Sequence, residues 1–124
     1  MDGGCSPGID LVSVARFEES VRRYGHRLLQ RLFTRRELAH APEGGRSLAA
    51  RFAAKEAFLK AIGTGLARGI SWQDVEVLRD PGGPPRLEVR GRAAELLGGR
   101  RARVSLSHTD ELAAAFVIVG GEDR

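Results

Sequence analysis

The longest apolar stretch of the chain is Ala49–Ile62, near its middle. It contains no Gly or Pro, ten of its fourteen residues are apolar, and the only β-branched residue is the last, so the stretch should form a helix. Its apolar residues go nearly all the way round the helical wheel, which indicates a buried helix. Four charges interrupt it, at Arg51, Lys55, Glu56 and Lys60. Because burying an unpaired charge is costly, we expect these four to find a partner, an ion or a charged ligand.

The N-terminal part predicts a flexible leader and then a strand. Residues 1–7 are rich in Gly and Pro, and we expect them to be disordered or loosely attached. Gly8–Val12 has the short apolar pattern of a strand, in which alternation points Asp10 away from its apolar neighbours, to solvent or into a cleft. Cys5, in the leader, is the only cysteine. A single cysteine excludes an intramolecular disulfide and is typical of a reducing cytoplasm, and we interpret this thiol as incidental.

The remainder of the first half of the chain carries sequence signals for the starts and ends of helices. Ser13 is a candidate N-cap for a helix over Val14–Arg23, and Gly25 separates that helix from a second apolar-faced piece. The other signals are a Thr34/Glu37 capping box for a short helix ending before Pro42, a loop over Glu43–Gly45, Ser47 as N-cap of the buried helix and Gly63 as its C′ residue.

The second half of the chain changes to a period of two. Alternating residues around Val75 and Leu87 predict a hairpin that turns at Asp80–Pro85, and two further apolar runs predict an antiparallel pair. These two runs are Arg103–Leu106 and Ala113–Val119, and a short helix over Gly91–Leu97 precedes them. Helices followed by strands indicate an α+β fold, with N-terminal helices packed on a small antiparallel sheet, in a single domain over residues 1–124.

Charge narrows the classes of partner. The chain has 42% hydrophobic and 29% charged residues, a net charge of +4 and a pI near 10.2, values of a soluble globular protein that favours acidic partners. No run approaches a membrane span, and the N-terminus lacks the features of a signal peptide. Seven Arg against two Glu lie between Arg16 and Arg36. This run is either a solvated helix face or a docking surface for an acidic partner.

Two carboxylates stand where packing alone would not put them: Asp10 in an apolar strand and Glu56 on an apolar helix. Such oxygen ligands suit Mg²⁺, which takes one or two protein carboxylates together with water and substrate phosphates. Lys60 follows Glu56 by one helical turn and would share the charge of a pyrophosphate. The alternative is a simple Glu56–Lys60 ion pair on one helix. Spacing alone does not show that Asp10 and Glu56 meet in space.

Few other residues of the sequence suggest a catalytic or binding role. His108 lies among small polar residues at the end of a strand, where it is either a functional imidazole or an ordinary turn histidine. The sequence has no CxxC, HExxH, P-loop, GxGxxG or GxSxG motif. A zinc site, a nucleotide-binding loop of these kinds and a nucleophilic serine are therefore unsupported.

Four segments, in this order and spacing, closely resemble the holo-[acyl-carrier-protein] synthases, the small bacterial 4′-phosphopantetheinyl transferases. They are Gly8-Ile9-Asp10 with Arg16-Phe17-Glu18, Phe33-Thr34 with Glu37, the block from Arg51 to Gly65 (RFAAKEAFLKAIGTG), and Val104–Thr109 (VSLSHT). The resemblance runs from about Gly8 to Val119. The RFAAKEAFLKAIGTG block is the most specific part.

The resemblance implies an enzyme for fatty acid biosynthesis that moves 4′-phosphopantetheine from coenzyme A to a serine of apo acyl carrier protein and releases adenosine 3′,5′-bisphosphate. It implies Mg²⁺ on Asp10 and Glu56, with Asp10, Glu56 and Lys60 as catalytic residues. Glu56, directly or through a metal-bound water, is the candidate for taking the serine proton. The family also implies a cytoplasmic homotrimer with active sites between neighbouring subunits, and neither nucleic acid nor a membrane as partner.

Two groups of binding residues follow from the same resemblance. Those expected to bind coenzyme A are Arg51, Lys60, Gly63, Thr64, Gly65 and His108, with Arg51 and His108 at the adenosine or its 3′-phosphate. For the carrier protein, the resemblance maps the family's docking arginine to Arg16, and the basic run of the first helix adds Arg22, Arg23 and Arg27 to the expected docking surface. The chain departs from the family in its longer leader with Cys5, and in Gly83-Pro84-Pro85 where Gly-Lys-Pro is usual.

Two alternatives stay open. The first is a basic module that binds RNA or acidic proteins without catalysis. It leaves Asp10 and Glu56 unexplained, and the chain has few aromatic residues for stacking bases. The second is another Mg²⁺-dependent phosphotransferase that serves peptidyl or polyketide carriers.

Overall fold

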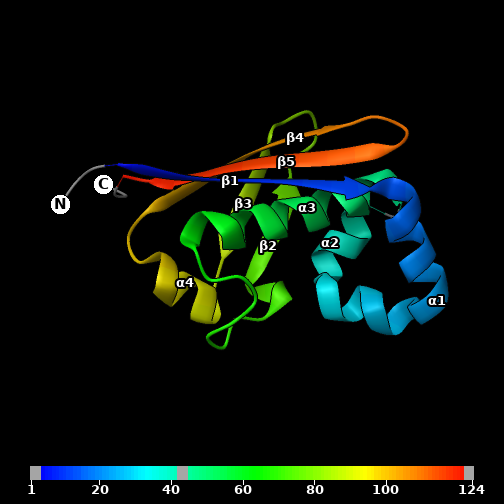
Figure 1. Ribbon diagram of the computed structural model, residues 1–124, viewed down its shortest axis with the longest axis horizontal. Helices are drawn as coiled ribbons and strands as arrows, with labels where there is room; N and C mark the ends of the chain where they lie inside the picture. Colours follow the sequence, from blue (N-terminus) through cyan, green and yellow to red (C-terminus); the bar gives the residue numbers. More distant parts are fainter. Residues whose placement is uncertain (1–3, 42–44, 122–124) are drawn as a thin grey trace.

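The computed structural model describes residues 4–41 and 45–121. The chain runs through β1 (Cys5–Ser13), α1 (Val14–Leu32), α2 (Arg35–His40), α3 (Gly45–Ile62), a 3₁₀ turn η1 (Trp72–Asp74), β2 (Val75–Arg79), β3 (Pro85–Val89), α4 (Gly91–Leu97), β4 (Arg101–His108) and β5 (Leu112–Gly120). Figure 1 shows the three long strands β1, β5 and β4 side by side above the helices. The α+β prediction is confirmed, although the strands form two sheets, β1-β5-β4 and β2-β3, in place of one.

The first strand is longer than the sequence predicts. β1 begins at Cys5, and the segment Cys5–Pro7 pairs antiparallel with the last residues of β5, from Gly120 to Ile118. The expected leader over residues 1–7 is therefore wrong from Cys5 onward, and residues 1–3 lie outside the described part. Pro7 is of a residue type that is depleted in strands, so the pairing with β5 overrides the local preference.

Helix α3 crosses the inner face of the three-stranded sheet, against β1 and β5. It is buried on nearly all sides, as predicted, and small residues (Ala53, Ala54, Ala57) let it lie close to the strands. The approach is closest at Gly8, where an added Cβ would lie 1.9 Å from the carbonyl oxygen of Ala57. Only glycine fits this position of β1.

The local signals for the helix ends are mostly confirmed. The Oγ of Ser13 accepts a hydrogen bond from the Arg16 amide at 3.2 Å, and Thr34 and Glu37 form the predicted capping box. Gly25 has φ of 65° and marks a kink in α1. Ser47 is not an N-cap, because α3 already begins at Gly45. Gly45, predicted in a loop over Glu43–Gly45, is the first residue of α3, and the other two residues of that loop lie outside the described part. Helix α2 ends at His40, before Pro42, as expected.

The predicted β-hairpin and the short helix predicted after it are also present. β2 and β3 pair antiparallel from Val75↔Val89 to Arg79↔Pro85, and α4 spans Gly91–Leu97. Residues 75–78 of β2 are all buried, because helices α2 and α3 pack against this strand as well as β3. The 3₁₀ turn η1 before β2 was not predicted. In residues 4–41 and 45–121, no helix is long and apolar enough to cross a membrane.

Candidate functional site

Asp10 faces the buried helix. In β1 the side chains of Ile9 and Leu11 point out of the sheet and are more than half exposed, so alternation turns Asp10 inward toward α3. There its Oδ1 accepts a hydrogen bond from the Nζ of Lys60 at 2.8 Å, and the same ammonium donates to the carbonyl oxygen of Ile9 at 3.0 Å. The cleft predicted as one alternative for Asp10 is therefore the space between β1 and α3.

Glu56 lies one helical turn before Lys60 and beside Asp10. Burial, and then the neighbouring Asp10 carboxylate, raise the pKa of Glu56 to about 7, while Lys60 acts in the opposite direction. Within the described part of the chain, the Oδ2 of Asp10 is the one buried side-chain oxygen or nitrogen without a hydrogen-bond partner. Two adjacent carboxylates with a buried, unpartnered oxygen form an arrangement that a cation would complete.

These carboxylates fit Mg²⁺ better than a transition metal. The described residues contain no group of three or more His, Cys, Asp or Glu that could hold a metal ion. Mg²⁺ needs fewer protein ligands, because it keeps water and substrate oxygens in its shell. The donor set of Asp10 and Glu56 therefore suits a metal that shares its coordination with a phosphate.

The residues after α3 form a turn at the end of the helix that carries Glu56 and Lys60. Gly63 ends the helix with φ of 79°, and its amide donates to the carbonyl oxygen of Leu59 at 3.0 Å, as expected for a C′ glycine. Thr64 and Gly65 follow directly. They lie one turn beyond Lys60, at the C-terminal end of α3. We call Asp10, Glu56 and Lys60, with the Gly63–Gly65 turn, the carboxylate half of the site.

Arg51 and His108 lie in a different place. Both line an open groove of about 1080 Å³, whose walls come from α2, α3, the end of β2 and the end of β4. Arg51 is buried, and its Nε donates to the carbonyl oxygen of Val77 at 3.1 Å. Its burial lowers the pKa of the guanidinium. None of Asp10, Glu56 and Lys60 lines this groove, which we call the basic groove.

Lys55, the fourth charge of the buried helix, belongs neither to the carboxylate half nor to the basic groove. Its ammonium is buried and donates to the Oε1 of Glu37 at 2.8 Å and to the carbonyl oxygens of Trp72 and Val75. The sequence left open whether Lys55 pairs with an acidic neighbour or contacts a ligand. In the fold it pairs with Glu37.

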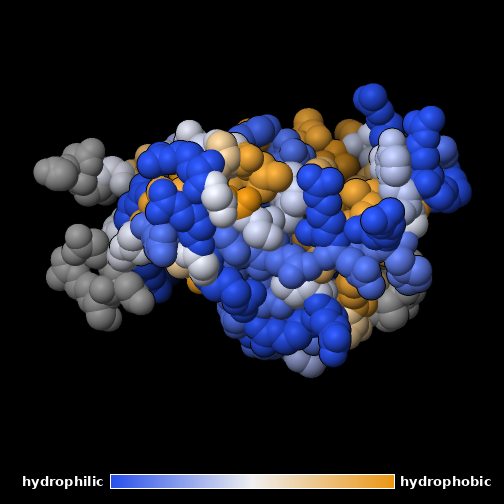
Figure 2. Space-filling model, turned by 90° about the horizontal axis from the view of Figure 1, so that it is seen from below, coloured by the Kyte–Doolittle hydropathy of each residue, from blue (hydrophilic) through white to orange (hydrophobic). Residues whose placement is uncertain are grey.

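The arginines of α1 lie on the outside. Arg16, Arg22, Arg23 and Arg27 are all exposed, and Arg22 forms an ion pair with Glu19 at 2.6 Å. Hydrophilic side chains project from the right-hand end of the molecule in Figure 2, the end at which Figure 1 places α1. A cavity of about 350 Å³ opens beside this helix. Phe17, Phe52 and Trp72 line its apolar wall, and Arg16 and Arg31 also line it.

On the outer face of the three-stranded sheet, β1 and β5 carry an apolar patch that is uncovered in the single chain. Its exposed side chains are Ile9 and Leu11 on β1 and Leu112, Phe116 and Ile118 on β5. The register sets Ile9 opposite Phe116, so these residues form one patch across the two strands. An exposed patch of this kind marks an interaction surface.

Residues 6–117 match the 4′-phosphopantetheinyl transferase superfamily. The chain belongs to this superfamily. Within it, the holo-[acyl-carrier-protein] synthase of Koribacter versatilis is 48% identical over 118 residues, covering 90% of this chain and 94% of that protein. The same enzyme of Moorella thermoacetica is 49% identical over 120 residues, covering 90% and 91%. The predicted membership of the phosphopantetheinyl transferases is thus confirmed.

Solved structures of phosphopantetheinyl transferases share the fold. The holo-[acyl-carrier-protein] synthase of Helicobacter pylori, in complex with coenzyme A, superposes with a TM-score of 0.85 at 30% identity, covering 92% of this chain and 99% of that one. That of Mycobacterium tuberculosis gives a TM-score of 0.77 at 37% identity, covering 95% and 99%.

Some residues of the site were not anticipated. Arg46 and Arg79 line the basic groove near Arg51, and Gly8 sets the distance between β1 and α3. Arg79 follows the last buried residue of a predicted strand, next to the turn cluster, and that position was an available signal for a functional side chain. The role of Gly8 depends on a contact between distant segments, and nothing in the local sequence reveals it.

Proposed function

We propose that this chain transfers the 4′-phosphopantetheine group from coenzyme A to a serine hydroxyl of apo acyl carrier protein, as a Mg²⁺-dependent homotrimer. Membership of the superfamily supports the reaction, and the holo-[acyl-carrier-protein] synthases that resemble the chain along most of its length support the carrier protein as acceptor. One structural observation carries the proposal for the chemistry: Asp10, Glu56 and Lys60 meet between β1 and α3.

In the reaction, the serine oxygen bonds to the phosphorus that carries pantetheine, and the phosphoanhydride bond of coenzyme A breaks. The serine proton goes to Glu56, and the electron pair of the broken bond stays on adenosine 3′,5′-bisphosphate. Glu56 is the proposed acceptor of this proton, directly or through a water, because its carboxylate lies beside Asp10 in the cleft that the phosphates would enter. Lys60 offsets the charge that develops on the leaving phosphate, because its exposed ammonium reaches the same cleft.

Asp10 and Glu56 would hold the metal. The unpartnered Oδ2 of Asp10 and the neighbouring carboxylate of Glu56 are the oxygen donors available to it. When bound, Mg²⁺ supplies positive charge for the pyrophosphate and for the leaving phosphate. Asp10 also keeps Lys60 in place through their 2.8 Å ion pair.

The two separated halves of the site argue for assembly. Arg51 and His108 are the residues proposed for the nucleotide end of coenzyme A, yet they line the basic groove and not the carboxylate half. We propose that a neighbouring subunit brings its basic groove to the carboxylate half. The exposed apolar patch on β1 and β5 supports such an assembly, because association would bury it.

The carrier protein is proposed to dock on α1. Arg16, Arg22, Arg23 and Arg27 would attract an acidic partner, and the apolar cavity beside them would accept a large apolar side chain. Charge would then guide the encounter, and apolar contact would hold the complex.

The decisive experiment incubates the protein with coenzyme A, apo acyl carrier protein and Mg²⁺, and follows the carrier by mass spectrometry. The expected result is the mass gain of one phosphopantetheine arm, which is lost when the metal is chelated. No gain with any divalent metal would overturn the proposed function. Gain that persists after chelation would overturn the role of the metal.

A further inference from the structure

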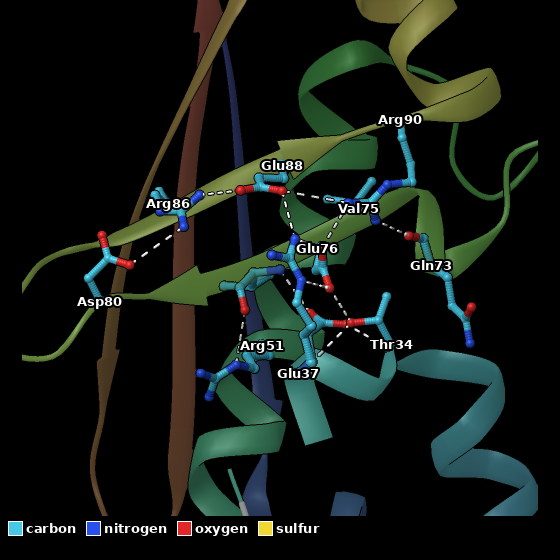
Figure 3. Close-up of polar contacts among 12 residues, drawn as sticks. Thr34, Glu37, Arg51, Gln73, Val75, Glu76, Asp80, Arg86, Glu88 and Arg90 are labelled. Carbon is cyan, nitrogen blue, oxygen red and sulfur yellow. Dashed lines mark hydrogen bonds and ion pairs between the residues drawn. The ribbon is translucent and has the colours of Figure 1, made fainter. Parts of the chain in front are cut away.

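The edge of β2 that does not face β3 is covered by charged side chains. The amide of Val77 donates to the Oε2 of Glu37 at 2.8 Å, and the carbonyl oxygen of the same residue accepts from Arg51. The carbonyl oxygen of Val75 accepts from Lys55 at 2.5 Å. Figure 3 shows Glu37 and Arg51 beside this strand, to which Val75 belongs. Helices α2 and α3 thus provide, through three side chains, the hydrogen bonds that a neighbouring strand would otherwise supply.

Lys55 is the most constrained of these side chains. Its three N–H groups have three acceptors, namely a carboxylate oxygen of Glu37 and the carbonyl oxygens of Trp72 and Val75. The side chains of Lys55 and Glu37 are 1% and 0% exposed. Lys55 therefore has no N–H donor left for a substrate, and all its hydrogen bonds join parts of this chain to one another.

The carboxylate of Glu37 is equally occupied. Besides the ammonium of Lys55, it accepts from the amide of Thr34 at 2.9 Å and from that of Val77. This one carboxylate therefore joins the start of α2, the middle of α3 and the strand β2. A buried ion pair contributes little to stability compared with a well-packed apolar pair, but its directional contacts fix geometry.

The geometry that Lys55 fixes is the rotation of α3 about its own axis. Glu56 follows it by one residue and Lys60 by five, so all three side chains turn together. With side chains reaching about 5 Å from the axis, a rotation of about 15° would move a side-chain end by more than about 1 Å. Metal ligation and proton transfer tolerate only a fraction of that distance.

We propose that Lys55 is a positioning residue for the transferase reaction. Anchored by Glu37 and the carbonyl oxygens of Trp72 and Val75, it fixes the rotation of α3 so that Glu56 and Lys60 face Asp10. The same contacts hold the start of β2, the strand whose other end lines the basic groove, in a fixed relation to α3. The proposal rests on the proposed function, because its effect is read in phosphopantetheine transfer.

The test is the variant Lys55→Met, which keeps the length of the side chain and removes its donors. Turnover is measured at saturating coenzyme A and carrier protein, together with the Mg²⁺ concentration for half-maximal rate and the KM for carrier protein. We expect kcat to fall about 10- to 100-fold, as for other groups that orient a metal ligand, and the Mg²⁺ requirement to rise. The KM for the carrier should stay within about twofold, since α1 is not part of the anchor.

Leu97→Ala serves as the matched control. Leu97 is buried on α4 in the same apolar core, and its truncation destabilises that core without removing any donor or acceptor of the Lys55 anchor. Both variants are assayed at a temperature where circular dichroism shows them folded. A Lys55→Met enzyme whose kcat and Mg²⁺ dependence match those of Leu97→Ala would overturn the proposal.

If Lys55→Met does not fold, Glu37→Gln provides a second test of the proposal. In this variant Lys55 retains its two carbonyl acceptors and loses only the carboxylate. A smaller fall in kcat with a raised Mg²⁺ requirement is expected, and wild-type values of both would overturn the proposal. Absence of transfer by the wild-type protein is a separate result, which overturns the proposed function itself.

Discussion

The contact between Gly8 and α3 gives the sharpest test of how the carboxylate half is built. In Gly8→Ala, the new methyl carbon would lie 1.9 Å from the carbonyl oxygen of Ala57 and 2.8 Å from the amide nitrogen of Ala61. Both partners are backbone atoms of a buried helix, so neither can rotate away. The strand must withdraw from the helix by about 1 Å or more to restore an ordinary contact.

Asp10 would move with the strand, because it lies two residues after Gly8 on the same face. Metal–oxygen distances are held to within about 0.2 Å, and a displacement of about 1 Å at a reacting group costs about 100-fold in rate. We therefore expect Gly8→Ala to lower kcat/KM about 100-fold and to raise the Mg²⁺ concentration needed for activity. Overpacking should lower the free energy of unfolding by about 1–3 kcal/mol.

The assay combines a Mg²⁺ titration of phosphopantetheine transfer with thermal unfolding. Gly99→Ala is the control, since a Cβ at Gly99 meets nothing within 4 Å, and its stability should change by less than about 0.5 kcal/mol with unchanged transfer. Wild-type Mg²⁺ dependence in Gly8→Ala would refute the reasoning, because it would mean that the strand can shift without moving Asp10 from Glu56.

Four further predictions concern charge and assembly. Glu56→Gln should abolish transfer yet stabilise the metal-free protein above pH 7, because the raised pKa of Glu56 means that ionising it costs stability as pH rises from about 4.5 to 7. Chemical denaturation at pH 5 and pH 8 checks this, and equal effects at both would contradict it. Hydrogen bonds from Arg36 lower the pKa of Glu76 to about 2, so its contribution of about 3 kcal/mol to the free energy of unfolding is complete above about pH 4.5 and is lost as pH falls toward 2. Glu76→Gln should therefore lose less stability than the wild type over that pH range. An unchanged pH dependence of stability in this variant would count against the role of the Arg36–Glu76 hydrogen bonds. Phe116→Glu should prevent assembly and remove activity, as read by light scattering, whereas a monomeric wild-type protein would contradict the trimer. Arg16→Glu should raise the KM for carrier protein at least about tenfold and leave that for coenzyme A unchanged; an unchanged KM for the carrier would exclude this docking surface.

Local chemistry made much of the fold predictable. The hydroxyl of Ser13, the Thr34 capping box and Gly63 define helix ends through contacts within a few residues, and the structure contains all three features. The apolar composition of α3 likewise made its burial predictable. Ser47 failed as an N-cap because α3 starts earlier, and its hydroxyl instead accepts a hydrogen bond from Arg51.

The sequence also identified the residues of the carboxylate half, through charges standing in apolar segments and through the resemblance to a family. It did not determine that Asp10 and Glu56 meet, because that contact joins a strand and a helix far apart in the chain. The structure brings them together through the close approach at Gly8, which depends on the absence of a side chain.

The remaining features were decided only by tertiary contacts. The first residues of β1 form a strand because β5 offers backbone partners, although Pro7 is of a residue type that is depleted in strands. Lys55 is an internal anchor because Glu37 and β2 surround it, whereas the neighbouring Lys60 reaches the cleft. On the sequence the two lysines differ only in their position on one helix. Which of them is buried against protein and which faces Asp10 depends on what packs against each side of that helix, and no local pattern contains this information.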